Sequence, residues 1–182
     1  MAIVTLADAK AQLNIPADDT SDDAELLGYV AAAAAAVEKE TGRVVERRVF
    51  TDQVPVGRPC RTILLPHVPV AELISLTSVD GYAWDVSAGA VVLDADSGAV
   101  TLLTGPPFSG TVVAVVEAGP AVVAPNDRLA GLIIIQHLWQ TQRGTMGIQL
   151  GGDSESGYVP GRGFAIPRRA QELLANPLPG VA

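Results

Sequence analysis

Residues 22–42 read DDAELLGYVAAAAAAVEKETG, and this stretch decides the helical part of the fold. The two leading aspartates supply an N-cap and negative charge at a helix start, and alanine is the best helix former. Gly42 is a typical stop signal. The stretch therefore predicts a helix over 22–41, roughly 30 Å long, whose small side chains let neighbouring backbones approach closely. We expect its apolar face to consist of Leu27, Val30, Ala34 and Val37.

Three further helices are predicted from shorter patterns. Thr5 and Asp8 are spaced like a capping box, and apolar residues follow at helical spacing until Asn14. Residues 125–143 are apolar on nearly every side, which indicates a central packed helix. Residues 167–175 begin with a proline, which favours the first turn of a short helix.

Between residues 44 and 124 the pattern changes to short β-prone runs separated by Pro, Gly and Asp. Such spacing favours a compact antiparallel β unit, with Cys60 in a loop. The predicted fold class is α+β, in which residues 1–43 and 125–182 form a four-helix core and residues 44–124 form a small inserted β unit. The strands are expected at 43–54, 62–65, 70–79, 82–84, 90–93, 99–103 and 111–117.

The charge pattern excludes a surface that binds nucleic acid through its phosphates. Twenty Asp+Glu against twelve Lys+Arg give a net charge of −8. Residues 1–42 and 80–127 each carry −6, and no Lys or Arg occurs between Arg61 and Arg128. A face built from these segments repels polyanions. The longest uninterrupted apolar run, 29–37, is far shorter than the roughly 20 residues that span a bilayer, so no membrane helix is expected.

Few residues could carry catalysis. His67 and His137 lie far apart in the sequence, and Cys60 has neither a histidine nor a helix start nearby to activate it. The acidic loop 18–23 lacks the glycine and glutamate positions of an EF-hand. Structural roles are favoured for all of them, so we predict no enzyme, no cofactor and no metal. The single cysteine cannot form an intrachain disulfide and fits synthesis in a reducing cytoplasm.

Several segments together resemble the tailed-phage head–tail connector (head completion or adaptor) family. They are VTLADAKAQLNI at 4–15, the acidic stretch ending AEL at 24–26, VEKETGR at 37–43, PNDRL through HLWQTQR at 125–143, and IPRRAQELL at 166–174. The order of these segments carries the resemblance more than any one of them. The fuller β segment at 44–124 departs from the simplest, mostly helical members.

The resemblance implies a structural protein of the virion neck, made in the host cytoplasm. It implies a ring, usually of twelve copies, fixed to the portal protein at the capsid vertex and joined to a downstream neck or tail protein. Double-stranded DNA would pass through the ring without specific binding, and no membrane is involved. Two alternatives stay open: another neck protein, such as a stopper or tail terminator, and a small-ligand-binding or enzymatic β domain with helical decoration.

Three sets of residues are expected to serve this role. The long helix would contact neighbouring subunits, although ordinary intrachain packing explains any one alanine as well. The C-terminal helix would dock on the portal. The turn aspartates would face the channel, with loop 18–23 as the second choice and simple solubility as the alternative. The candidate subunit contacts are Ala32 and Ala35. The candidate portal contacts are Arg168, Arg169, Leu173 and Leu174. The candidate channel-facing acids are Asp80, Asp85, Asp94 and Asp96. Residues 144–163 and 176–182 are expected to be mobile in the free subunit.

Overall fold

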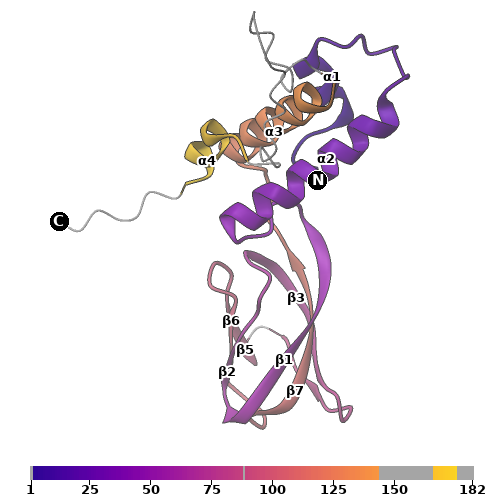
Figure 1. Cartoon of the computed structure of the whole chain (residues 1–182). Helices are drawn as coiled ribbons and strands as arrows, with labels where there is room; N and C mark the ends of the chain where they lie inside the picture. The colour runs from indigo at the N-terminus through magenta and orange to yellow at the C-terminus, as the bar shows by residue number, and fades with distance from the viewer. Residues whose placement is uncertain (1, 88, 144–165, 176–182) are drawn as a thin grey trace, which may run out of the picture. The chain divides into compact units, whose positions relative to one another are not determined.

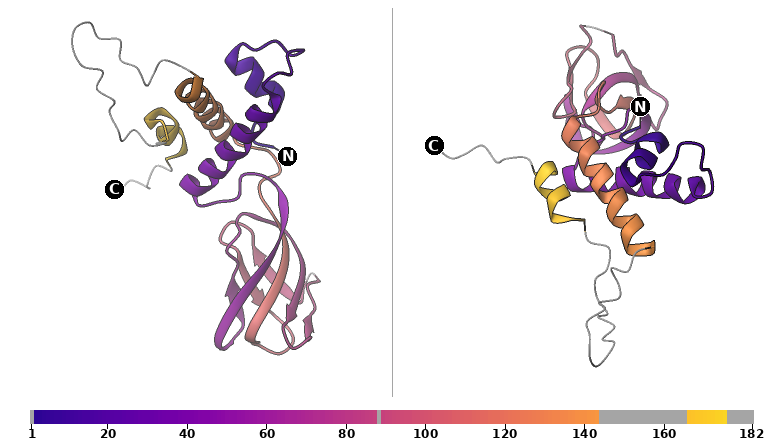
Figure 2. Two further views of the ribbon diagram at one scale, coloured as in Figure 1. Left: turned by 45° about the vertical axis from the view of Figure 1, so that its right-hand side comes forward. Right: turned by 90° about the horizontal axis from the view of Figure 1, so that it is seen from above.

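The computed structural model describes residues 2–87, 89–143 and 166–175 (Figure 1). The mobility predicted for 144–163 and 176–182 therefore falls outside the described residues. The chain divides into two compact units, which we call the helical unit (Ala2–Gly42 and Ala124–Ala182) and the β unit (Arg43–Val123). Figure 2 shows the elements of both from two further sides.

The first helix of the helical unit, α1 (Leu6–Leu13), begins with the predicted capping box. The backbone N–H of Asp8 donates to the Thr5 hydroxyl at 3.2 Å, and the Thr5 N–H donates to the Asp8 carboxylate at 3.1 Å. Two N–H groups that a helix start leaves unpaired are thereby satisfied. The helix ends at Asn14, which adopts the left-handed conformation at φ 57°. This local prediction is confirmed.

The long helix α2 (Asp23–Thr41) follows the predicted bounds within one residue and ends at Gly42, at φ 67°. Its buried face matches the prediction at Ala34 and Val37 but differs at Leu27. Leu27 is exposed, and the buried residues are Leu26, Tyr29, Ala33, Ala34 and Val37. In an alanine tract every face has similar hydrophobicity, so the large side chains Leu26 and Tyr29 decide which face turns inward.

Helix α3 (Pro125–Arg143) is the centre of the helical unit and contacts α1, α2 and α4 (Arg168–Leu174). Ala130, Ile134 and Ile135 of α3 are buried. Polar bonds fix α3 to its neighbours: the Gln12 amide donates to the Gln136 oxygen at 2.9 Å, and the Tyr29 hydroxyl donates to the Gln142 oxygen at 2.7 Å.

The β unit contains two antiparallel sheets. The four-stranded sheet has the order β1-β7-β3-β4, and the three-stranded sheet has the order β2-β6-β5. Alternate residues of the strands face a shared core that includes Phe108, Val112 and Leu76. The strands are β1 (Arg48–Cys60), β2 (Thr62–Leu64), β3 (Val70–Ser78), β4 (Ala83–Trp84), β5 (Val91–Asp94), β6 (Ala99–Leu102) and β7 (Phe108–Ala118).

The predicted four-helix core with a small inserted β unit is wrong, although the α+β class holds. Among the described residues, four helices and seven strands divide the chain about equally, and the β unit has a core of its own. Two strands extend beyond their expected bounds, and β1 begins at Arg48 rather than at residue 43. β7 begins at Phe108, and β1 continues past Pro55 to Cys60, where the sequence suggested a loop. Proline is tolerated there because β1 is an edge strand.

Candidate interaction surfaces

The histidines and the cysteine are not assembled into a reactive centre in the described part of the chain. His67 Nδ1 lies 2.6 Å from Asp52 Oδ1, and its ring stacks on Phe50 at 3.8 Å between centroids. His137 lies on α3 of the other unit, and the Cys60 thiol donates to the Thr62 carbonyl at 3.2 Å. The described residues contain no group of three or more His, Cys, Asp or Glu that could hold a metal ion.

The Asp52–His67 pair is structural on this geometry. The Asp52 side chain is 3% exposed, and its Oδ2 has no hydrogen-bond partner among the described residues. His67 comes from the connection between β2 and β3, so the pair fastens this connection to β1. The pair is not predictable from residue types, because nothing in the sequence indicates that Asp52 faces the core rather than solvent.

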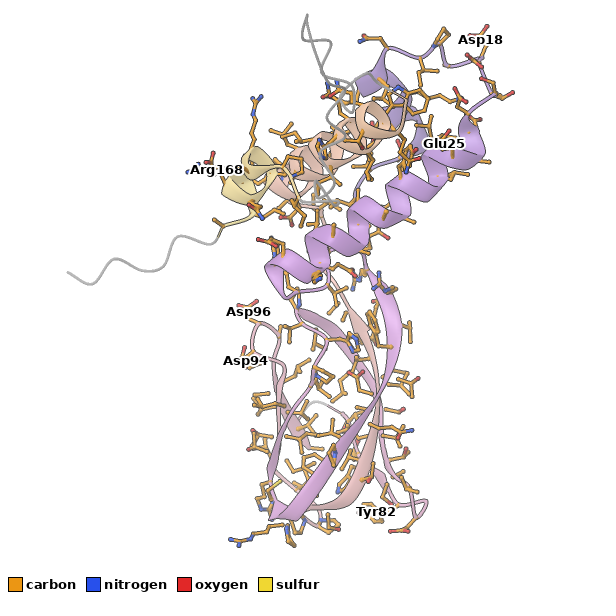
Figure 3. All side chains as sticks on the ribbon, in the orientation of Figure 1. Asp18, Glu25, Tyr82, Asp94, Asp96 and Arg168 are labelled. Atoms are coloured by element: carbon orange, nitrogen blue, oxygen red, sulfur yellow. The ribbon has the colours of Figure 1, made fainter. Side chains whose placement is uncertain are left out.

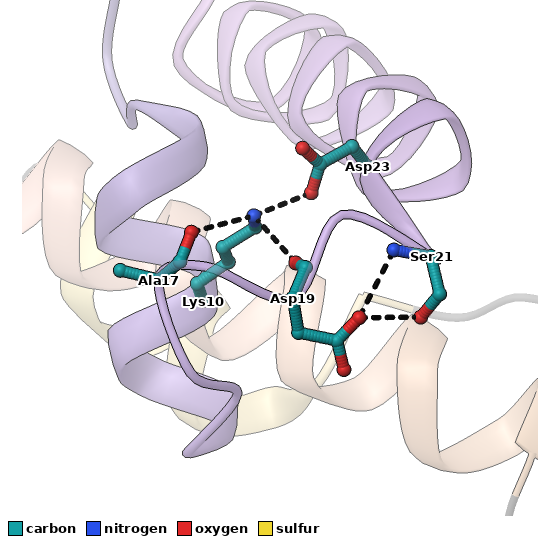
Figure 4. Close-up of polar contacts among 5 residues, drawn as sticks. All are labelled: Lys10, Ala17, Asp19, Ser21 and Asp23. Carbon is teal, nitrogen blue, oxygen red and sulfur yellow. Dashed lines mark hydrogen bonds and ion pairs between the residues drawn. The ribbon is translucent and has the colours of Figure 1, made fainter.

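The acidic loop before α2 is organised by one buried lysine (Figure 4). Lys10 Nζ lies 2.6 Å from Asp23 Oδ1 and donates to the carbonyls of Asp19 and Ala17 at 2.8 and 3.4 Å. Asp19 accepts from the backbone N–H and the hydroxyl of Ser21, which lower the pKa of its carboxyl. The ion pair and the two carbonyl contacts explain why a lysine is buried here. Loop 18–23 therefore has a defined shape around Lys10.

Helix α2 presents an exposed face of small and apolar side chains. Ala32 and Ala35, the predicted subunit contacts, are both exposed, so neither is buried by packing against the described residues. Leu27 is 53% exposed on the same helix. The remaining exposed residues of this face are Ala24, Gly28 and Ala31. None of these side chains carries a charge.

The C-terminal helix α4 divides the predicted portal contacts into two groups. Arg168 and Arg169 are exposed, and Arg168 Nε lies 3.3 Å from Glu172 Oε1. Leu173 is half-buried, whereas Leu174 is buried in the helical unit. The two arginines and Leu173 are therefore the accessible members.

The four turn aspartates do not form one cluster. Asp94 and Asp96 lie in the turn between β5 and β6, at the end of the β unit opposite Tyr82 (Figure 3). Asp80 belongs to the turn that ends at Tyr82, and Asp85 follows β4. All four are exposed.

Hydrogen bonds favour the ionised form of two of these acids. The Ser97 hydroxyl, followed by the Asp96 N–H, lowers the pKa of Asp94. The Ser87 N–H and then its hydroxyl lower the pKa of Asp85. Both carboxyls therefore carry negative charge at neutral pH.

Residues 3–65 match the family model described as phage gp6-like head-tail connector protein. The matched segment contains α1, α2, β1 and β2. This match confirms the resemblance to phage head-tail connectors for residues 3–65. No curated protein matches the sequence. No helix among the described residues combines the length and the apolar character needed to cross a bilayer.

Solved structures extend the likeness over nearly the whole chain. A chain from the neck of an empty gene transfer agent (GTA) particle, computed with C6 symmetry, is 22% identical with a TM-score of 0.65, covering 98% of this chain and 93% of that chain. The virion of the native GTA particle contains a chain 21% identical, with a TM-score of 0.66 and the same coverage. A chain in the neck of the native GTA particle, computed with C12 symmetry, is 21% identical with a TM-score of 0.60. That match covers 96% of this chain and 91% of that chain. At these identities the likeness shows a common fold, including the enlarged β unit.

Proposed function

We propose that this chain is a structural protein of the neck of a tailed-phage-like particle, where it forms a ring beneath the portal. One observation carries the proposal: the N-terminal segment matches the head-tail connector family, and the chain folds like proteins of GTA necks over 98% of its length. Those necks were computed with C6 and C12 symmetry, which supports a closed ring of copies. The family resemblance implies twelve copies. The role is structural, and no cofactor takes part.

The exposed face of α2 suits contact between copies in the helical unit. Its alanines permit close approach of a neighbouring backbone, and burying the uncharged Leu27 is favourable. Acidic faces of two copies repel one another, and a contact through a neutral face avoids this repulsion. Ala32 and Ala35 lie toward the C-terminal end of this face, which runs from Ala24 to Ala35.

The C-terminal helix is the proposed portal contact. Arg168 and Arg169 are exposed cations on a chain whose surface is otherwise mostly acidic, and Leu173 is partly accessible beside them. Arginine can bind a carboxylate with two parallel hydrogen bonds, which gives a contact both strength and orientation. The partner surface on the portal protein is therefore expected to be acidic.

The ring is proposed to continue the DNA channel from the portal to the downstream neck or tail protein. Of the four candidate acids, Asp94 and Asp96 lie together on one tip and are the members we retain for the channel wall. Negative charge there repels the DNA phosphates, so the DNA does not adhere to the channel wall. DNA passes without specific binding.

The test uses the full chain and the portal protein encoded with it. We expect the two to co-sediment as one complex in which the number of copies of this chain matches a symmetric ring. Ala32→Trp places a bulky side chain on the neutral face and should prevent complete rings, whereas the matched variant Ala32→Ser should not. Absence of any complex with the portal, with both proteins folded, contradicts the proposal.

A further inference from the structure

The two outer strands of the four-stranded sheet carry opposite charge at the same end of the β unit. On the β1 side, Arg58 and Arg61 are exposed where the chain turns into β2; we call this pair the arginine corner. On the β4 side, Asp80 and Asp85 flank β4 and are exposed. Pro55 of β1 pairs with Thr111 of β7, and the Thr111 carbonyl accepts a hydrogen bond from the N–H of Val79. The arginine corner follows Pro55 and Asp80 follows Val79 in the sequence, so the basic and acidic residues lie at the same end of the sheet.

The two charged sets are separated across the sheet. β1 and β4 are three strand spacings apart, about 14 Å. Arg58 and Asp80 form no ion pair within the described residues, and the Arg61 guanidinium donates to the Leu102 carbonyl at 3.4 Å rather than to a carboxylate. The opposite charges are therefore available to a second molecule, with one sign on each side.

The acidic side also exposes apolar surface. Val79 is 68% exposed and Tyr82 is 48% exposed, and both lie in the turn that holds Asp80. We call Val79, Asp80, Tyr82 and Asp85 the β3–β4 edge patch. Tyrosine is enriched among the residues that dominate binding energy at protein interfaces, and an aromatic face also attracts a guanidinium.

The turn that presents this patch is held rigidly. The Ser78 N–H donates to the Tyr82 carbonyl at 2.7 Å, and the Tyr82 N–H donates to the Ser78 hydroxyl at 3.0 Å. Gly81, at φ 90°, permits the turn. The Tyr82 ring lies edge-to-face on the buried Trp84 at 5.1 Å, and the Trp84 indole donates to the Pro106 carbonyl at 3.0 Å. Such a surface loses little conformational entropy on binding.

We propose that the arginine corner of one copy docks on the β3–β4 edge patch of the next copy. The guanidinium groups of Arg58 and Arg61 would bond the carboxylates of Asp80 and Asp85, with the Tyr82 ring beneath them. A contact between two different sides of the same chain is heterologous, and it closes into a ring when the rotation between copies allows. The inference rests on the proposed ring and assigns the β unit a part in it.

The native Cys60 provides a direct test, because it lies between the two arginines and the chain has no other cysteine. Val79→Cys places a second thiol in the edge patch. Treatment of the full-length variant with a short bismaleimide should give a ladder of multimers beyond the dimer, weaker at high salt. The matched control Val49→Cys puts a thiol at a similarly exposed position, 59% against 68%, at the far end of β1 and should give no ladder.

Charge exchange separates this contact from other modes of assembly. The pair Asp80→Arg and Asp85→Arg, introduced with Val79→Cys, should reduce the ladder at least about tenfold, since like charges then face each other. Adding Arg58→Asp and Arg61→Asp in the same chain should restore it.

Four results overturn the inference. Coupling that stops at the dimer indicates a symmetric contact, and coupling unaffected by charge exchange indicates that these groups do not meet. Complete rings on the portal without coupling leave the neck function intact and remove only this contact. Failure of the chain to form any multimer or portal complex instead removes the proposed function together with the inference.

Discussion

Replacing Lys10 by methionine should destabilise the helical unit while keeping the length of the side chain. Lys10 is 7% exposed, and its ammonium contacts the Asp23 carboxylate at 2.6 Å and the Asp19 carbonyl at 2.8 Å. Removing one partner of a fully buried ion pair costs about 3–5 kcal/mol. Asp23 is 28% exposed, so water solvates part of the charge left behind. We therefore expect a loss of about 2 kcal/mol in the free energy of unfolding.

Urea titration followed by circular dichroism at the helix band measures this loss, because the described helices all belong to the helical unit. Lys39→Met is the matched control, since Lys39 is exposed near the end of α2, and it should change stability by less than about 0.5 kcal/mol. In a double-mutant cycle with Asp23→Asn, the two changes should couple by about 1 kcal/mol. Equal, small effects of both lysine variants would refute the role of Lys10 as an organising contact.

Three further outcomes are expected from urea titrations. Gly119→Ala should cost the β unit about 2 kcal/mol or more, because φ is 113° and a Cβ would meet the Arg47 Cα at 2.7 Å, whereas Gly57→Ala meets nothing and should be nearly neutral. His67→Ala leaves the buried Asp52 without its partner and should cost about 2 kcal/mol, a loss that neutralising the aspartate as well should partly recover. The backbone N–H of Thr5, and then its side chain, lower the pKa of Asp8 below 3.8. The stability that the Asp8 carboxylate contributes is therefore present above pH 3.8 and is lost as the pH falls further. Asp8→Asn should flatten the dependence of the unfolding free energy on pH between about pH 5 and about pH 3.

Features set by neighbouring residues could be predicted from the sequence. The capping box needs only Thr5 and Asp8 at a spacing of three, and the end of α2 needs only a glycine that tolerates positive φ. The strands followed from β-prone runs and turn residues. All of these signals lie within a few positions of the element that they define.

Features set by distant pairing could not be predicted. Leu26 is buried and Leu27 is exposed because of the side of α2 on which α3 packs. The alanine tract does not indicate that side, because its faces are equally hydrophobic. The length of β7 depends on pairing with β1 on one side and β3 on the other. A helix-surface lysine normally extends to water, so the burial of Lys10 becomes visible only when the following loop folds over it.

The same limit applies to the candidate interaction residues. The sequence indicates a set of aspartates in turns, but it does not indicate at which end of a sheet each turn lies. The structure separates Asp94 and Asp96 from Asp80, which gives the two groups different surroundings and different proposed partners. The exposure of Tyr82, placed by its contact with Trp84, was likewise not predictable from residue type.

The measurement that tests the neck assignment most directly is electron cryo-microscopy of particles produced by the genome that encodes this chain. We expect a closed ring of copies at the portal vertex, with the helical unit and the two-sheet β unit recognisable in each copy. We also expect the arginine corner to face the β3–β4 edge patch of the neighbouring copy. Particles whose neck lacks this chain, or in which the chain lies in the capsid shell or the distal tail, would disprove the neck assignment.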